Sequence, residues 1–543
     1  MREPGKSGIF AMGRASSKRT PARIGKAADS ARKEAETVGA WLVVLLLVPR
    51  LVRLFYPQIW VEDDFYLESA YLVSIGMRPY LDFVHPHFPL LEWIAGAYLR
   101  LFGASHFSIE VLNESAIYVT SLLVFVLGRR VAGRTVGTCA AILYATSSLV
   151  FRYHVYEREC FLAPLTVAAA IVALGRDERW GRRAGHQALA LIAALGIKLT
   201  AAIPSAVLFG FAVVRKRWRE AAVLALEVGA GLAAMTALCY WLYGYDFIFQ
   251  TFLFHFLKGH DTGDPILTYP LQILDVEFPL FGIGCVALGA ERRMNEGIAL
   301  VLAMVAASYL FYGVISPTAW GHNYLEPLPY IAIVAGIGLD WMIHLGRDFL
   351  HAEEHEAFPV LSRLVTAALV VVVSLAWISP LKNQNWLHGS VYGFGFMPKS
   401  QITGIAAAIR DGSAPDENVI APSFLCFEAN RPQLIRFPET YGVYRNARAE
   451  VEKHGFFKAR AMLDHADFFN LIVKTSGYWT TQIKQAVTQG TAPIVVPDSP
   501  IQLLPLVFVP PEVLAASGYR PALETKYFIV WRHFAKPGGA ESR

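Results

Sequence analysis

Charged residues are scarce in this chain of 543 residues. Asp, Glu, Lys and Arg together make up 17% of the sequence, against about 25% in an ordinary soluble protein. Hydrophobic residues make up 54%, and the mean hydropathy is +0.38. So few charges in so long a chain exclude a purely soluble protein.

Cysteine is also rare, with five residues and no C-x-x-C pair. Four of the five lie in or beside apolar segments, where a thiol packs as a small apolar group, so we expect no disulfide framework. Residues 1–36 lack apolar periodicity and are expected to form a disordered basic tail. No small-residue cleavage site follows the first apolar run, which disfavours a cleavable signal peptide.

Long apolar runs dominate residues 37–384. A membrane span needs about 20 mainly apolar residues, and about eleven segments are candidates. Residues 187–214 are short for two crossings. We count them as two because both flanks are basic, so both flanks should lie on the same side of the membrane. We therefore expect a mainly α-helical polytopic bundle. The predicted spans are 38–57, 108–128, 134–151, 160–175, 187–199, 200–214, 220–243, 276–290, 295–315, 323–343 and 360–379.

The distribution of Lys and Arg predicts the orientation of these spans. The loops on one side, with the N-terminal tail, carry 24 of these residues, and the loops on the other side carry six. Cytoplasmic loops have the excess of positive charge. An odd number of spans then places the N-terminus in the cytoplasm and the C-terminal residues outside. Because the positive charge is explained by topology, a nucleic-acid partner is not expected.

Apolar runs shorten to strand length in residues 385–543, and Gly, Pro and Asp separate them. The segment 400–411 has helical spacing instead. We therefore expect a soluble extracytoplasmic α/β domain, in which we recognise no catalytic motif. The predicted strands contain Val419–Ile420, Phe468–Val473, Ile494–Val496, Leu506–Val509 and Tyr527–Trp531.

The large first outer loop, residues 58–107, begins with three consecutive carboxylates, Glu62, Asp63 and Asp64. Such a cluster can be a solvated loop mouth. Its neighbours, however, are apolar or amphipathic, and desolvation and mutual repulsion in such a surface raise carboxylate pKa values. That is the setting of a general base.

Basic residues and histidines flank this cluster. Arg50 and Arg53 share one helix face in the outer half of span 1, where a charge is either functional or reaches the interface with its long side chain. His85 and His87 are two residues apart, but no third ligand stands at a telling spacing, so we predict no metal site.

Three later segments add ionisable residues on the same side. The second outer loop contains Arg158 with Glu157 and Glu159, which form either a structural ion-pair cluster or part of a shared outer cavity. Lys198 is the only charge between His186 and Arg215, and an isolated ammonium group at that depth requires an anion. His322, Tyr324 and Glu326 precede the apolar run of span 10.

Taken together, these segments resemble the GT-C superfamily of membrane glycosyltransferases. The resemblance covers mainly residues 45–200 and 320–340, and it is nearest to the bacterial branch related to protein O-mannosyltransferases and to the aminoarabinose and galacturonosyl transferases of lipopolysaccharide. Asp63–Tyr66 resembles D-[DE]-x-Y, Gly76–Asp82 resembles G-x-x-P-Y-x-D, His87–Leu90 resembles K-P-P-L with His for Lys, Gly196–Thr200 resembles G-x-x-x-L-T-K with the Lys displaced, and His322–Pro329 resembles H-x-Y-x-x-x-x-P.

The resemblance implies a glycosyltransferase of the inner (plasma) membrane. It would move a sugar from a polyprenyl-phosphate donor to an envelope lipid, glycan or protein acceptor. The leaving phosphate needs cations rather than an acid for its stabilisation, and these residues demand no metal or cofactor. The implied roles are Asp63 as base, Asp64 as orienting group, Lys198, Arg53, His87 and Arg158 at the donor phosphate, and Glu157, Glu159, His322 and Tyr324 at the substrate.

Two other classes stay open at this point. A transporter or flippase of lipid-linked sugars also has ionisable residues at membrane depth. Such proteins usually contain internal repeats, and we find none in this sequence. A non-catalytic scaffold for envelope assembly would tolerate alanine at Asp63.

Overall fold

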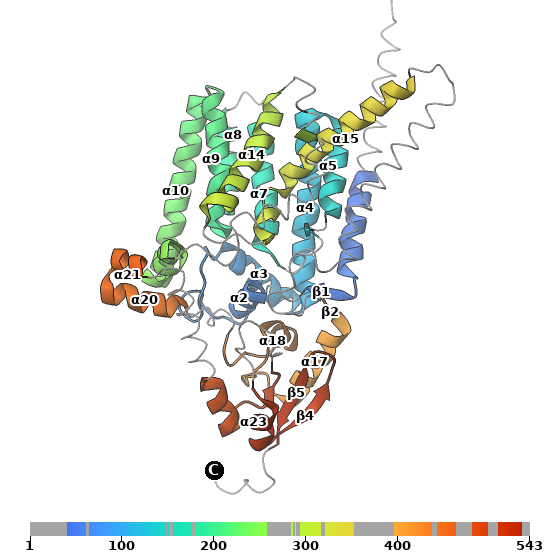
Figure 1. Ribbon diagram of the computed structural model, residues 1–543. Helices are drawn as coiled ribbons and strands as arrows, with labels where there is room; N and C mark the ends of the chain where they lie inside the picture. Colours follow the sequence, from blue (N-terminus) through green and yellow to red (C-terminus); the bar gives the residue numbers. More distant parts are fainter. Residues whose placement is uncertain are drawn as a thin grey trace, which may run out of the picture.

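The structure, a computed structural model, is mainly helical (Figure 1). The predicted tail 1–36 and the predicted spans 360–379 and, for the most part, 276–290 lie outside the described residues. The described residues are 41–60, 64–147, 149–150, 156–175, 180–257, 284–285, 288, 294–316, 321–351, 396–436, 443–462, 481–497 and 509–534.

Long helices form one bundle, and the C-terminal residues lie at one end of it (Figure 1). Among the described residues, three helices are long and apolar enough to cross a membrane by length and composition, and two more are apolar but shorter. The helices of the bundle are 41–54, α4 (His106–Ala132), α5 (Arg134–Thr146), α7 (Arg158–Ala173), α8 (Trp180–Ile197), α9 (Ala202–Val214), α10 (Trp218–Tyr243), α14 (Glu296–Leu310) and α15 (Leu328–His351).

Glycines allow α4, α5 and α15 to pack closely. A Cβ atom on Gly128 of α4 would lie 2.8 Å from the Cα of Gly137 in α5. A Cβ on Gly336 of α15 would lie 2.9 Å from the carbonyl oxygen of Val136. Small residues at such contacts are typical of helices that associate in membranes, because they let the backbones approach.

The predicted short pair of spans at 187–214 is longer in the structure. Helix α8 begins at Trp180, so the basic residues that were taken as a flank belong to its first turns. Arg183 is held there by Glu220, with Nε to Oε1 at 3.0 Å. A 3-10 turn, η1 (Leu199–Ala201), then precedes α9.

The first loop is structured, although the sequence analysis assigned it no elements. It contains β1 (Gln58–Trp60), α2 (Asp64–Ser74) and α3 (Leu90–Phe102). The two helices pack on each other, and Arg100 fastens α3 to the end of α2 by donating to the carbonyl oxygen of Ser74 at 2.6 Å. Both helices lie between the bundle and the C-terminal residues (Figure 1).

The C-terminal residues combine short helices with a three-stranded antiparallel sheet in the order β3-β5-β4. Strand β4 was not predicted, and Val419 and Ile420 form isolated bridges rather than a strand. The predicted strand 468–473 lies outside the described residues. The elements are β2 (Phe396–Pro398), α17 (Lys399–Gly412), α18 (Ser423–Ala429), α20 (Val443–His454), α21 (Phe456–Met462), β3 (Ile494–Val495), α23 (Pro511–Ala516), β4 (Tyr519–Glu524) and β5 (Ile529–His533).

Three contacts tie these residues to the bundle. Strand β1 pairs with β2 in antiparallel register, with Ile59 opposite Met397. The Lys399 ammonium group donates to Glu110 of α4 at 2.6 Å. The His106 N–H, at the start of α4, donates to the Glu428 carboxylate at 2.9 Å. The loop after the first span is therefore enclosed between the bundle and the C-terminal residues.

Candidate active site

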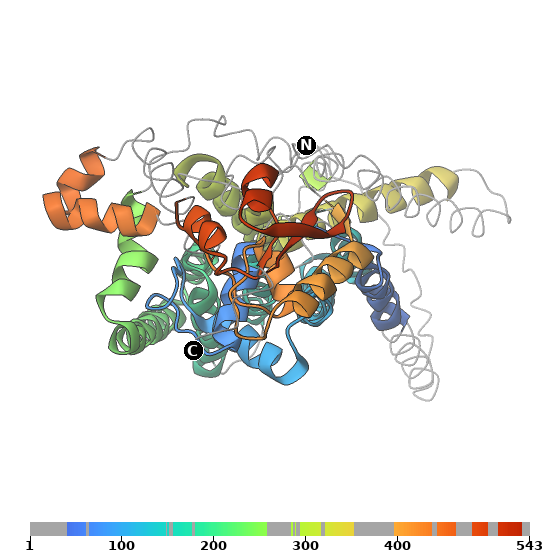
Figure 2. The ribbon, with the colours of Figure 1, turned by 90° about the horizontal axis from the view of Figure 1, so that it is seen from below.

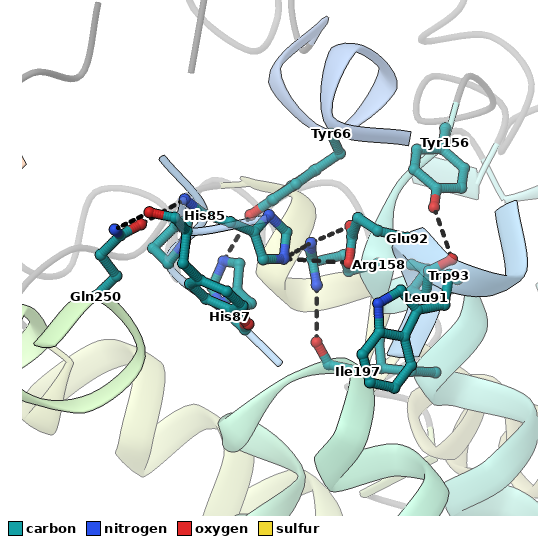
Figure 3. Close-up of polar contacts among 12 residues, drawn as sticks. Tyr66, His85, His87, Leu91, Glu92, Trp93, Tyr156, Arg158, Ile197 and Gln250 are labelled. Carbon is teal, nitrogen blue, oxygen red and sulfur yellow. Dashed lines mark hydrogen bonds and ion pairs between the residues drawn. The ribbon is translucent and has the colours of Figure 1, made fainter. Parts of the chain in front are cut away.

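A fully buried group of three ionisable side chains lies where α3 meets the start of α7 (Figure 3). His85, Glu92 and Arg158 are each 0% exposed. Arg158 donates to Oε1 of Glu92, and His85 Nε2 lies 3.2 Å from Oε2 of the same carboxylate. These residues come from the loop before α3, from α3 itself and from the first residue of α7. Arg158, which was predicted to bind the donor phosphate, therefore has a buried partner, Glu92, that was not identified from the sequence.

The His85 loop is held from the other side by Gln250. This residue lies in the π-helical turn η2 (Phe249–Leu253), between α11 (Tyr245–Ile248) and α12 (Phe254–Leu257). Its Oε1 accepts from the His85 N–H at 2.8 Å, and its Nε2 donates to the Tyr80 carbonyl at 3.1 Å. Tyr80 has φ 69°, a conformation that non-glycine residues rarely adopt, and its hydroxyl donates to the His87 carbonyl. The loop is thus fixed at both histidines.

The charges in this group determine its ionisation. Burial favours the neutral carboxylic acid at Glu92, but Arg158 and His85 outweigh it, so the pKa of Glu92 lies below its ordinary value. Burial lowers the pKa of His85, although Glu92 opposes the shift. At neutral pH the group is therefore an arginine–carboxylate pair beside a neutral imidazole.

His87 faces the same space as Arg158. Its Nε2 lies 3.2 Å from the Tyr66 hydroxyl, and its ring stacks on that of His255 with centroids 5.7 Å apart. The Arg158 guanidinium lies over the Tyr66 ring at 4.6 Å. Burial and the cations Arg158 and Lys198 put the pKa of His87 well below its ordinary value. His87 is therefore a neutral hydrogen-bonding group at pH 7, unlike the lysine that the related motif has at this place.

A second buried group surrounds Lys198. Its ammonium group donates to Oε1 of Glu159 and, at 3.0 Å, to Oδ1 of Asn323. Lys198 is 7% exposed and Glu159 is 0% exposed. The turn between α8 and η1 presents Lys198, while α7 presents Glu159 and η4 (Gly321–Leu325) presents Asn323.

Glu157, Glu159 and His322 approach one another near this lysine. Each offers one ligand atom, and these atoms all lie within 4.8 Å of one another. Two carboxylates and an imidazole could hold a divalent cation such as Zn²⁺. They could equally bind sugar hydroxyl groups as acceptors and donors. The backbone N–H of Glu157 donates to Asn113 of α4 at 3.3 Å, which fixes the start of this segment.

The two buried groups adjoin each other. Arg158 and Glu159 are consecutive, and Arg158 also donates to the carbonyl oxygen of Ile197 at 2.8 Å (Figure 3). Ile197 directly precedes Lys198. The structure therefore brings together Arg158, Lys198 and the neighbouring His87, which the sequence analysis assigned to one phosphate.

The other predicted residues lie apart from this point or outside the description. Asp63 is not among the described residues, and Asp64 begins α2. Arg53 is buried beside Tyr56 in a different group, where it interacts electrostatically with Glu110 and Glu114. Arg50 also binds Glu114 there, at 2.9 Å.

Tyr324 is fully buried in the apolar core, with its ring 5.2 Å from that of Tyr309. A pocket of about 290 Å³ lies next to the Arg53 group, between the end of helix 41–54, the start of α4 and α17. In the described contacts, Arg53 therefore lies in a different group from the other three phosphate candidates, Lys198, His87 and Arg158.

A known family model matches part of the chain. Residues 84–242, which include His85, Glu92, Arg158 and Lys198, match the model described as dolichyl-phosphate-mannose-protein mannosyltransferase. No curated protein sequence matches the chain.

Solved structures share this fold across almost the whole chain. ArnT from Cupriavidus metallidurans bound to undecaprenyl phosphate has a TM-score of 0.65 and 14% identity, covering 92% of this chain and 98% of that one. The apo state of the same protein has a TM-score of 0.62, with the same identity and coverage. An oligosaccharyltransferase from Archaeoglobus fulgidus, tethered with an acceptor peptide, has a TM-score of 0.46 and 12% identity. The match covers 80% of this chain and 72% of that one. The resemblance to GT-C glycosyltransferases that the motifs indicated is therefore confirmed by the family match over residues 84–242, and the fold is that of the ArnT structures.

Proposed function

We propose that the protein transfers a sugar from a polyprenyl-phosphate donor to a hydroxyl group of an envelope lipid, glycan or protein. The observation that carries this proposal is the convergence of Arg158, Lys198 and His87 at one end of the bundle, where His87 is contributed by the first loop. The similar structure of ArnT was solved with undecaprenyl phosphate bound, which supports a lipid phosphate as the ligand of these cations.

In this proposal the leaving group is the lipid phosphate. Asp63 takes the proton of the acceptor hydroxyl, whose oxygen attacks the anomeric carbon while the bond from that carbon to the phosphate oxygen breaks. The released phosphate carries negative charge away from the sugar. Arg158 and Lys198 stabilise it because preorganised charges in a water-poor site act strongly and need no rearrangement.

The buried carboxylates keep those cations in position before the donor binds. Without Glu92 and Glu159, two cations buried so close together would repel each other and would be costly to desolvate. A donor phosphate adds further negative charge between them. His87 contributes a hydrogen bond rather than a charge, since its pKa lies well below neutrality.

The remaining polar residues are assigned to the sugar or the acceptor. Glu157, Glu159 and His322 lie together beside Lys198, which donates to Glu159. Carboxylates accept hydrogen bonds from sugar hydroxyl groups, and a neutral imidazole can donate one. A requirement for a divalent cation at these residues would appear as loss of transfer on chelation and recovery on adding metal.

Substitution of Asp63 tests the proposed reaction. Asp63→Asn keeps the size of the side chain but removes its basicity, so transfer should fall about 10²–10⁴-fold. Donor binding should change little, because other groups hold the phosphate. Asp64→Asn and Glu62→Gln are matched controls and should be milder. The assay is transfer from a polyprenyl-phosphate sugar by purified enzyme in lipid; normal turnover in both Asp variants would refute the assignment.

A fusion tests the side of the membrane. Alkaline phosphatase joined after residue 400 should be active, because the Lys and Arg asymmetry predicts that this segment is extracytoplasmic. An inactive fusion, with an active cytoplasmic reporter at the same position, would place the site on the opposite face.

A further inference from the structure

Helices α20 and α21 project sideways from the molecule. In Figure 1 they lie beyond the lower end of α10, level with the domain end of the bundle. Figure 2, seen from below, shows them again at the periphery rather than beneath the bundle. A membrane that surrounds the bundle would therefore lie directly against these two helices.

Helix α20 is firmly attached at this edge. The Tyr444 ring packs on Phe254 of α12 with centroids 3.6 Å apart. Arg448 pairs with Asp246 and lies over the Tyr245 ring at 5.6 Å. Buried Ala447 completes an apolar contact that also includes Val84 of the first loop. The position of α20 beside α10 is thus set by specific packing.

The neighbouring end of α10 has the character of a membrane interface. Only 11% of the apolar stretch of this helix is buried inside the protein, so most of that stretch faces its surroundings. Its last turns expose Trp241 by 80% and Tyr240 by 55%, and Tyr245 follows at 45%. Exposed Trp and Tyr residues gather where a span meets the headgroup layer. The contact of α20 with Tyr245 places it at that level.

Helix α21 exposes apolar and basic side chains together. Phe457 is 83% exposed and Met462 is 44% exposed. The exposed residues around them include Lys453, Lys458 and Arg460, and the segment 453–462 contains no Asp or Glu. Aromatic and aliphatic groups beside Lys and Arg are typical of helices that lie in the plane of a membrane surface with anionic lipids.

We propose that α21 and Lys453, at the end of α20, lie in the headgroup layer next to α10, whereas Glu452 before them pairs with Arg448. Phe457 and Met462 enter the acyl region, and the basic residues contact the phosphates of anionic lipids. Continuity with the exposed aromatic end of α10 and the one-sided positive charge both favour the bilayer over a protein partner. This surface does not depend on the sugar-transfer reaction. It does adjoin η2 and α12, which carry Gln250 and His255 next to the candidate site.

A spin label tests the location of α21. Cys285 is the exposed cysteine and the other four are buried, so a Cys285→Ser background leaves one reactive position in Met462→Cys. The full chain is placed in nanodiscs of phosphatidylcholine and phosphatidylglycerol. Ala515→Cys, on exposed α23 at the far end, is the matched control. We expect the label at 462 to collide with oxygen more than with a nickel chelate, and the label at 515 to show the reverse.

Charge variants test the lipid preference. Lys458→Glu with Arg460→Glu should move the label at 462 toward water in these nanodiscs, and the milder Gln pair should do so partly. Lys484 is exposed on a different helix, residues 481–489, so Lys484→Glu should have no effect. A label at 462 that is as accessible to the nickel chelate as the label at 515 would overturn the proposal. So would a label shielded from both reagents, which indicates a protein partner, or an equal depth in phosphatidylcholine alone, which would leave the basic residues without a role.

Discussion

Glu92 offers the sharpest test of the site, because its carboxylate is fully buried and bonded to Arg158. Glu92→Gln keeps the shape of the side chain and removes the charge. Arg158 then stays buried without its counter-ion, since its other described partners are the Ile197 carbonyl and the rings of His85 and Tyr66. The expected consequence is loss of stability and displacement of the guanidinium from its present place.

The magnitude follows from the burial of the pair. Removing one partner of a buried ion pair costs about 3–5 kcal/mol, because the remaining charge is uncompensated. Arg448 and Glu452 provide a matched control, with side chains 35% and 62% exposed against 0% for both Arg158 and Glu92. Exposed pairs contribute about 0–1 kcal/mol. Glu452→Gln should therefore change the free energy of unfolding far less than Glu92→Gln.

Equilibrium unfolding in mixed detergent micelles measures both variants. A double variant separates stability from function: Glu92→Leu with Arg158→Met removes both charges and should recover most of the stability, since apolar replacement of a buried pair is often neutral. Sugar transfer should stay lost in the double variant if Arg158 holds the phosphate. A loss below about 1 kcal/mol for Glu92→Gln, the range of an exposed pair, would refute the reasoning.

Three further outcomes are expected. Lys198→Met should abolish sugar transfer and destabilise the protein. Adding Glu159→Gln to this variant should restore stability but not transfer. Equilibrium unfolding measures the stability, and the transfer assay measures the activity. His87→Gln should leave the shape of the rate profile unchanged between about pH 6 and 8, where a histidine with an ordinary pKa would titrate. Burial opposes ionisation of Glu428, but its bonds to His106 lower its pKa below the ordinary 4.5. The contribution of Glu428 to stability should therefore be fully present above pH 4.5 and should weaken as the pH falls further. Hydrogen exchange of the α18 amides should rise in acid. Glu428→Gln should remove this dependence on pH.

The membrane-spanning character and several site residues could be predicted from local sequence. Apolar runs near span length are sufficient to locate helices such as α10 and α14. Lys198 was identified because it is a lone charge in an apolar stretch, and Arg158 and Glu159 because they lie in a short charged loop. Each of these signals depends on residues that are close in the chain.

The residues that sequence analysis missed depend on contacts between distant segments. Glu92 stands in the first turn of a helix, where an acidic residue is favoured by the helix dipole alone, so nothing local distinguishes it. Gln250 meets His85 across 165 residues. His255 was not singled out because a single histidine in an aromatic stretch has no spacing to interpret. Its role is visible only where its ring stacks on His87.

The pairing of β1 with β2 has a consequence for how the protein is made. Lys399, which directly follows β2, donates to the carbonyl of Leu54, 345 residues earlier. A ribosome must therefore deliver almost every helix of the bundle before the first loop can acquire its partner strand. Until then β1 is an open edge, and Glu110 lacks the ammonium group of Lys399. A chain released before β2 is made would insert its helices yet leave this loop unfinished, so the loop can close only after synthesis has passed residue 398.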